Sequence, residues 1–166
     1  FTMVLLPFQG DDGSIQIFDV NAGGSAHTWV VNGNAQIDTS QFKPGIGTSS
    51  LLLDGTGDFI TTIDSTNFTL GSGNFTFDAW FYCNAVGGVA RAIAGQTDPG
   101  FTAASAWYLR RNTSNVMEFA SKGAGPTLTG TTQFTNLLNS GFHHVAVERN
   151  GNTWTLFIDG IGGISS

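Results

Sequence analysis

Apolar and polar residues alternate along residues 142–160, FHHVAVERNGNTWTLFIDG, on both sides of Asn150-Gly151. A period of two residues is the spacing of a β-strand that turns one face towards a core. Asn-Gly is the preferred two-residue loop of a hairpin, because both central positions of a type I′ turn have positive φ. The pattern therefore predicts an antiparallel hairpin with its loop at Asn150-Gly151. The apolar positions that share its buried face are Val145, Val147, Trp154, Leu156 and Ile158.

The longest strand candidate covers residues 74–83, NFTFDAWFYC. Because successive side chains of a strand point to opposite faces, both faces of this segment carry aromatic groups. We expect one face to be buried and the other to line an outer surface or to lie under a long loop. The first face holds Phe75, Phe77, Ala79 and Phe81, and the second holds Thr76, Asp78, Trp80 and Tyr82.

Shorter strand candidates occur along the rest of the chain, separated by turns rich in glycine, asparagine and aspartate. Asn32-Gly33 predicts a second hairpin, and the turn over residues 54–58 predicts a third. Apolar residues do not recur at helical spacing over three turns, and only residues 136–138 predict a short helical turn. The shorter strand candidates are residues 3–8, 27–31, 34–38, 51–53, 59–63, 89–94, 107–111, 116–121 and 127–129.

Composition agrees with an all-β chain: 14 residues are phenylalanine, 23 are glycine and only 11% are charged. Short antiparallel strands bury their apolar faces by closing a barrel or by stacking two sheets. Two aromatic faces on residues 74–83 favour the stacked arrangement. The sequence therefore predicts a two-layer antiparallel β-sandwich, formed as one domain over residues 1–166.

The net charge is −6, with ten aspartates and two glutamates among the 166 residues. This acidity argues against nucleic-acid backbones and anionic lipid surfaces as partners. The sequence has no apolar stretch of 18 residues, so we expect no membrane insertion.

Six pieces of the chain, taken in order, resemble the laminin-G-like, concanavalin A-like jelly-roll superfamily. The resemblance is to the branch common in bacteriophage tail and virion-surface proteins and in secreted bacterial proteins. It implies a jelly-roll β-sandwich that acts as an interaction module. The pieces are LLPFQGDDGS (5–14), NGNAQID (32–38), SLLLDGTGDF (50–59), FTFDAW (75–80), FHHVAV (142–147) and LFIDG (156–160).

One departure from that family concerns the end of the sequence. The family continues after the last hairpin with a further strand and a closing strand, which pairs beside the first strand. The present sequence stops at Ser166. The jelly roll is therefore expected to lack its closing strand, and the sequence is expected to be a fragment of a longer protein. A partner subunit that completes the sheet is the alternative.

Some members of the superfamily are glucanases, which carry closely spaced acidic residues on one strand. Here Glu118 and Glu148 are the only glutamates, and neither has a carboxylate two residues away. We therefore expect no catalytic residues, although a lyase that uses His144 and Arg149 stays open. A serine nucleophile is not expected either, because no G-x-S-x-G sequence occurs. His143 and His144 are adjacent in a strand candidate and point to opposite faces, which favours a structural role over a shared metal ion.

Calcium is the one cofactor that the resemblance implies, since laminin-G-like domains often hold Ca²⁺ at the sandwich rim. Aspartate carboxylates and main-chain carbonyls in tight turns supply the oxygen ligands that this ion prefers. The alternative is that the same aspartates cap turns. The candidate ligands are Asp11, Asp12, Asp19, Asp54 and Asp58.

Exposed aromatic side chains are the candidate glycan contacts, because a sugar ring stacks on a flat aromatic face while polar groups bind its hydroxyls. Trp107 and Tyr108 follow a polar stretch and are expected at the surface. For Trp80 a position in the core is favoured over a position in a surface binding site. The candidate ligand-binding residues are Trp107, Tyr108, Arg110, Asn112, Trp80 and Tyr82.

The sequence as a whole predicts a non-catalytic module at a virion surface or at an extracellular or cell surface. Its expected partners are a glycan or other protein subunits, within a homo-oligomeric or virion assembly. Two alternatives remain: a structural capsid decoration or fibre protein without a glycan ligand, and, ranked last, a polysaccharide-degrading enzyme.

Overall fold

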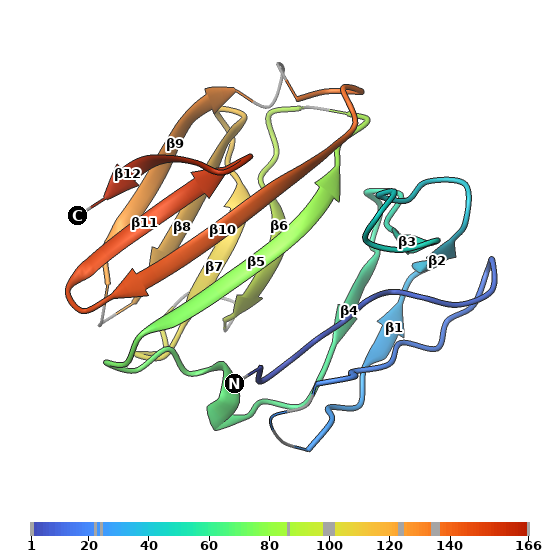
Figure 1. Cartoon of the computed structure of the whole chain (residues 1–166), viewed down its shortest axis with the longest axis horizontal. Coiled ribbons are helices and arrows are strands. Elements are labelled where there is room, and N and C mark those ends of the chain that lie inside the picture. Colours follow the sequence, from blue (N-terminus) through green and yellow to red (C-terminus); the bar gives the residue numbers. More distant parts are fainter. Residues whose placement is uncertain are drawn as a thin grey trace. The chain divides into compact units, whose positions relative to one another are not determined.

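The computed structural model describes residues 2–21, 23, 25–85, 87–97, 102–122, 125–133 and 137–165. It divides the chain into two compact units, an N-terminal unit Phe1–Ser65 and a C-terminal unit Thr66–Ser166 (Figure 1). The organisation as a single domain stays a prediction. In the described part of the chain the regular elements are strands and one short 3₁₀ turn, as expected for an all-β protein.

The C-terminal unit contains two four-stranded antiparallel sheets (Figure 1). In the first sheet the spatial order is β12-β11-β10-β5, and in the second it is β6-β7-β8-β9. The first sheet consists of β5 (Phe75–Tyr82), β10 (Phe142–Asn150), β11 (Thr153–Ile158) and β12 (Ile161–Ser165). The second consists of β6 (Arg91–Gln96), β7 (Trp107–Arg111), β8 (Val116–Ser121) and β9 (Thr127–Gln133), and the 3₁₀ turn η1 spans Thr66–Phe68.

The predicted hairpin at the end of the chain is formed by β10 and β11, but its loop lies one residue later than expected. Asn150 pairs with Thr153, so the two loop residues are Gly151 and Asn152. Gly151 has φ of 62° and Asn152 is not among the positive-φ residues, which is the pattern of a type II′ turn with glycine first. The Asn74 carboxamide oxygen accepts a 2.8 Å hydrogen bond from the Gly151 amide and fixes this register.

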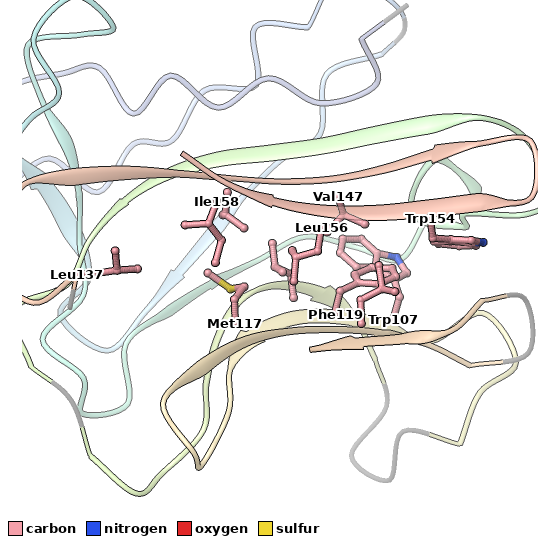
Figure 2. Close-up of a cluster of buried hydrophobic side chains, with 11 residues drawn as sticks. Trp107, Met117, Phe119, Leu137, Val147, Trp154, Leu156 and Ile158 are labelled. Atoms are coloured by element: carbon pink, nitrogen blue, oxygen red, sulfur yellow. The ribbon is translucent and has the colours of Figure 1, made fainter. Parts of the chain in front are cut away.

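The core of the C-terminal unit lies between its two sheets (Figure 2). Alternation within each strand sends every second side chain into this layer. Trp154 makes an edge contact with Phe75, with ring centroids 5.3 Å apart, and a second contact with Phe119 at 5.7 Å. The side chains from the two sheets therefore interdigitate, as in a concanavalin A-like sandwich. The most deeply buried are Leu109, Met117, Phe119, Leu128, Val145 and Val147.

Arg111 ends β7 inside this unit and is only 6% exposed. Its guanidinium donates hydrogen bonds to the carbonyl oxygens of Gly87 (2.6 Å) and Val89 (2.8 Å), and also to the Asn115 side chain. A buried guanidinium is costly unless its donors are paired. Arg111 therefore ties the segment before β6 to the β7–β8 turn through main-chain oxygens.

The N-terminal unit contains two two-stranded ladders, in which β1 (Val30–Asn32) pairs with β4 (Phe59–Thr61) and β2 (Gln36–Asp38) pairs with β3 (Ser50–Leu52). The two hairpins predicted for this region are therefore wrong, because the strands on either side of each turn do not pair with one another.

A contact between the two turns of the N-terminal unit explains this pairing. The Asn34 amide donates a 2.8 Å hydrogen bond to Asp58 Oδ1, which brings the turn after β1 against the turn before β4. Gly33, with φ of 71°, allows this close approach, because a Cβ at that position would lie 2.3 Å from Asp58 Oδ1.

The strand predicted over residues 3–8 is also wrong, since that segment enters no ladder. The Leu5 amide donates instead to Asp19 Oδ1 at 2.9 Å, and the Leu5 carbonyl accepts from the Val20 amide at 2.9 Å. Pro7 has no N–H to offer a ladder, and Phe8 has φ of 50°, which turns the chain out of an extended conformation.

Two smaller differences concern the C-terminal unit. The helical turn expected over residues 136–138 lies partly outside the described residues, and residues 137–139 form a turn. β12 pairs with β11 although alternation did not predict it, because its sequence is largely glycine and isoleucine. The expected absence of a closing strand stays a prediction.

Candidate functional site

The outer side of β5 and β10 carries a group of aromatic and polar residues that we call the aromatic face. It consists of the outward-pointing side chains of Asp78, Trp80, Tyr82, Phe142 and His144. The strand register places Trp80 opposite His144 and Tyr82 opposite Phe142, with ring centroids 5.0 Å and 5.7 Å apart. Two aromatic pairs therefore stand side by side on a surface that faces away from the core.

Trp80 is 39% exposed, so the expectation that it lies in the core is wrong. Its neighbours Ala79 and Phe81 take the inward positions and pack against the core cluster, which leaves Trp80 on the outer side. Asp78, two residues earlier, also points outward, and its carboxylate lies 3.6 Å from the His144 imidazole. An exposed flat ring beside a carboxylate and an imidazole is suited to a polar ligand with an apolar side.

A shallow hollow of about 310 Å³ lies on the same outer side of the first sheet. It is lined by Glu148, Asn150, Thr153 and Thr155. The register pairs Glu148 with Thr155 on β11, so the hollow begins two rungs of the sheet beyond the Asp78 rung. Among the described residues, the Glu148 carboxylate has no hydrogen-bond or ion-pair partner. We call this feature the polar hollow.

Tyr82 is held at the far end of the aromatic face by the turn that precedes β10. Its hydroxyl donates a 3.2 Å hydrogen bond to Asn139 Oδ1, and the Asn139 amide donates to the Cys83 carbonyl at 2.9 Å. Asn139 has φ of 53°, a conformation that asparagine tolerates better than most residues. This turn therefore fixes the orientation of the Tyr82 ring.

A second group of candidate residues meets on the outer side of the other sheet, around Glu118. Tyr108 donates to Glu118 Oε1 at 2.9 Å, Arg110 donates to the same oxygen at 2.6 Å and 2.9 Å, and Asn112 donates to Oε2 at 3.2 Å. The Arg110 guanidinium also lies 4.1 Å from the centre of the Tyr108 ring. The structure thus brings together three predicted binding residues, but around a glutamate that the sequence analysis considered only as a catalytic acid.

The electrostatics of the Glu118 cluster follow from these contacts. Partial burial alone would raise the pKa of Glu118, but the hydrogen bonds from Asn112, Tyr108 and Arg110 outweigh it and lower that pKa below its usual value. Burial and the adjacent carboxylate raise the pKa of Tyr108. The cluster is therefore an internally paired network, in which Tyr108, Arg110 and Asn112 all donate to the Glu118 carboxylate.

Trp107 does not belong to either surface group, so the expectation that it is exposed is wrong. It is 6% exposed, and its indole N–H donates a 2.7 Å hydrogen bond to the Phe68 carbonyl. Its ring lies 5.8 Å from Phe77 and takes part in the core (Figure 2). Trp107 and Tyr108 are adjacent in β7 and point to opposite faces, so they cannot contact one ligand.

The two glutamates are likewise separated. Glu118 lies between core residues of β8 and points outward from the second sheet, whereas Glu148 points outward from the first. The sheets pack through their inner faces, so the two carboxylates lie on opposite sides of the sandwich. They cannot flank one glycosidic bond, as paired carboxylates must in a hydrolase.

His143 contacts two other side chains, and alternation along β10 did not indicate this arrangement. Its Nδ1 lies 2.7 Å from Asp159 Oδ2, and its Nε2 lies 2.8 Å from the Ser140 hydroxyl oxygen. That hydroxyl also donates to the Leu137 carbonyl at 2.8 Å, which competes for the proton that a serine nucleophile would give to histidine. The contact chain therefore fastens the turn before β10 to the end of β11.

Asp159 is fixed from both sides in this arrangement. Burial alone would raise its pKa, but the hydrogen bonds from the His143 ring and from the His144 amide lower it below the usual value. Asp159 has φ of 51°, a conformation that aspartate tolerates in tight turns. In the sequence, the pair Asp159-Gly160 after an apolar strand is the signal for this turn. His143 and His144 point to opposite faces of β10, as expected.

The aspartates proposed as calcium ligands accept hydrogen bonds from the protein itself. Asp19 accepts from the amides of Leu5 (2.9 Å), Asn21 (3.2 Å) and His27 (3.0 Å), and its Oδ2 lies 2.9 Å from His27 Nδ1. Burial would raise the pKa of Asp19, but these bonds together hold it well below its usual range. This carboxylate organises the beginning of the N-terminal unit.

The other four aspartates lie in turns. Asp58 accepts from the Asn34 amide at 2.8 Å and from the Asp54 amide at 2.9 Å, and the Asp54 carboxylate accepts from the Thr56 amide at 2.6 Å. Asp12 accepts from Thr39 at 3.1 Å, and the Asp11 carbonyl accepts from the Ser14 amide. Within the described residues, no three histidine, cysteine, aspartate or glutamate side chains gather as a metal site would require. Calcium binding stays a prediction.

Comparison with known families identifies the class of this sandwich. A laminin-G-type family model, described as the concanavalin A-like lectin/glucanases superfamily, matches residues 54–162. The chain belongs to this superfamily, whose laminin-G-like members are generally non-catalytic and bind carbohydrates or proteins. No curated protein matches the chain. In the described part of the chain, no helix has the length and apolar character needed to cross a membrane.

Proposed function

We propose that the chain is a non-catalytic module that binds a glycan through the aromatic face. The observation that carries this proposal is the exposed ring of Trp80, paired with His144 and flanked by Asp78 on the outer side of the first sheet. A pyranose presents an apolar side that stacks on an indole, while its hydroxyls need polar partners around the ring. The aromatic face supplies both.

The polar hollow extends this surface. Asn150, Thr153 and Thr155 offer a carboxamide and two hydroxyls, which both donate and accept hydrogen bonds. A sugar polymer that stacks on Trp80 would continue along the sheet towards these groups. In this proposal the ligand is a chain of several sugars, held on one flat side by aromatic rings and at one end by hydroxyl-binding residues.

The setting that we propose is the surface of a virion or of a bacterial cell. The superfamily membership and the resemblance of the chain to phage and secreted bacterial proteins support it. The Glu118 cluster is not included in the binding surface, because Arg110 and Tyr108 are already engaged with the carboxylate.

The test is a glycan array with the full chain, followed by calorimetric titration of each hit. Trp80→Ala is expected to weaken binding by about two- to tenfold or more, since one aromatic contact contributes about 0.5–1.5 kcal/mol beyond its buried area. Phe42→Ala is the matched control, because Phe42 is 37% exposed and lies outside both sheets of the C-terminal unit. Absence of binding to every bacterial polysaccharide on the array, or equal weakening by both variants, would refute the proposal.

The second candidate function is assembly with neighbouring subunits without a glycan ligand. It is favoured by the large apolar side chains that are exposed in the N-terminal unit, since contacts with a neighbouring subunit would remove their apolar surface from water. Light scattering coupled to size exclusion tests it: a stable oligomer supports assembly, and a monomer at high concentration contradicts it. The most exposed of these side chains are Ile15, Phe18, Ile46 and Ile63.

A further inference from the structure

The charges of the candidate binding surface are all of one sign. At the outward positions of β5, β10 and β11 the acidic residues are Asp78 and Glu148, and these positions hold neither lysine nor arginine. His144 adds a positive charge only when it is protonated. A ligand that lies along this surface therefore meets two carboxylates without a permanent cation beside them.

The arginine of β10 does not neutralise these carboxylates. Arg149 occupies an inward position, where its guanidinium donates to the carbonyl oxygens of Gly71 and Gly151, each at 2.9 Å. It also lies 5.1 Å from the centre of the Trp154 ring. These contacts hold the guanidinium away from the outward face that carries Glu148.

The two carboxylates lie on one side of Trp80 along the direction of the strands. Asp78 lies two residues from Trp80 on β5, and Glu148, which pairs with Thr76, lies two residues further along the sheet. Each step of two residues along a strand is about 6.6 Å, so both charges lie within reach of a ligand that spans two or three sugars.

We infer that the glycan bound by the aromatic face carries free amino groups, as a partly deacetylated hexosamine polymer does. This inference rests on the proposed function and names the chemical class of the ligand. An ammonium group beside the stacked sugar would pair with Asp78, and one on a following sugar would reach Glu148, which has no partner among the described residues. The net charge of −6 also attracts a cationic polymer at long range and repels an acidic one.

A glycan fits these observations better than a basic peptide does. The described part of this surface is a sheet face with an exposed indole and a hydroxyl-lined hollow. Stacking on an indole and hydrogen bonding to threonine hydroxyls are the contacts that a sugar makes. A basic peptide would use the carboxylates but not the hollow.

The experiment is calorimetric titration of the full chain with glucosamine oligomers and with N-acetylglucosamine oligomers of the same length, at a pH that protonates the free amines. The glucosamine oligomers are expected to bind about tenfold more tightly, and the difference should shrink as salt is added. Asp78→Asn and Glu148→Gln should each weaken binding of the glucosamine oligomers more than binding of the acetylated oligomers, so that the preference between the two becomes smaller. Asp11→Asn is the control, because it changes the net charge equally in a residue outside the first sheet.

The outcomes separate the inference from the proposed function. In one outcome, acetylated or other neutral glycans bind as tightly as the glucosamine oligomers or more tightly, and Trp80→Ala still abolishes that binding. This result would overturn the inference and leave the proposed function in place. Absence of binding to any glycan would overturn both. An oligolysine peptide that binds as tightly as the glucosamine oligomers, whether or not Trp80 is present, would assign the surface to basic peptides and would also overturn the inference.

Discussion

Trp80 and Trp107 lie in different environments, so their replacement separates the stability of the fold from the affinity for a ligand. Trp107 is 6% exposed and packs between the sheets, whereas Trp80 is 39% exposed on the outer side. Replacing each with alanine should therefore affect two different properties. Trp107→Ala should lower the free energy of unfolding, and Trp80→Ala should lower the affinity for glycan.

The magnitudes follow from burial. Deleting a buried tryptophan costs about 3–5 kcal/mol, since both transfer free energy and packing are lost. Trp107→Phe keeps a ring but removes the N–H that donates to the Phe68 carbonyl at 2.7 Å, which costs about 1–3 kcal/mol. Trp80 already exposes more than a third of its surface, so Trp80→Ala should cost only about 1–2 kcal/mol.

Urea unfolding followed by far-UV circular dichroism measures these differences without relying on the fluorescence of the deleted tryptophans. The midpoint should fall most for Trp107→Ala and least for Trp80→Ala, at an unchanged dependence on urea concentration. Glycan titration of the same variants supplies the second measurement. A Trp107→Ala protein that loses less than about 1 kcal/mol of stability and yet fails to bind glycan would refute the assignment of inner and outer faces.

Three further predictions concern turns and carboxylates. The pKa of Asp159 is lower in the folded protein than in the unfolded chain, so its ionised form stabilises the fold above the unfolded pKa of about 3.9. This stabilisation is lost as the pH falls through the lower pKa of the folded state. The difference in melting temperature between the wild type and Asp159→Asn should therefore be largest near pH 7 and should disappear at acidic pH. Gly33→Ala should lower the melting temperature more than Gly55→Ala, because both positions have positive φ but only a Cβ at residue 33 meets Asp58 Oδ1, and equal losses would contradict this. The predicted calcium site is tested by chelation with EDTA: a melting temperature that falls on chelation and is restored by Ca²⁺ would support it, and an unchanged melting temperature would contradict it.

Alternation predicts the elements of the C-terminal unit well, since each of its long strands carries its own buried and exposed positions. The hairpin of β10 and β11 is local, so a turn signal between two alternating segments is sufficient to pair them. The loop is nevertheless displaced by one residue, because the Asn74 side chain binds the Gly151 amide. A contact with a residue 77 positions away cannot be seen in the local sequence.

The pairings of the N-terminal unit could not be predicted from turn residues. Asn32-Gly33 does reverse the chain, but β1 then pairs with β4, and the strand after the turn pairs with β3. The Asp58 carboxylate bound to the Asn34 amide favours this arrangement. Its effect depends on a tertiary contact, so propensity and periodicity alone leave the choice of partner open.

In the candidate site, too, the sequence indicates which residues share a face but not which tertiary contacts they make. Alternation establishes that Trp80 shares a face with Asp78 and Tyr82, but it does not state which face of an aromatic strand is buried. For β7 the correct choice was available, because Trp107 shares its face with Leu109, and an apolar pair at alternate positions indicates a core. The contact chain of His143 and Asp159 had only the turn sequence after β11 as a signal.

The pairing of β5 with β10 has a consequence for how the chain acquires its binding surface. These strands are neighbours in the first sheet, yet all of β6 to β9 lies between them in the chain. Bringing them together closes the longest loop of the unit, which carries an entropic cost that local hairpins avoid. Since Trp80 and His144 come from opposite sides of this junction, neither strand alone presents the ring pair. Ligand affinity thus reports completion of the sandwich, and a bound glycan would protect that junction against opening.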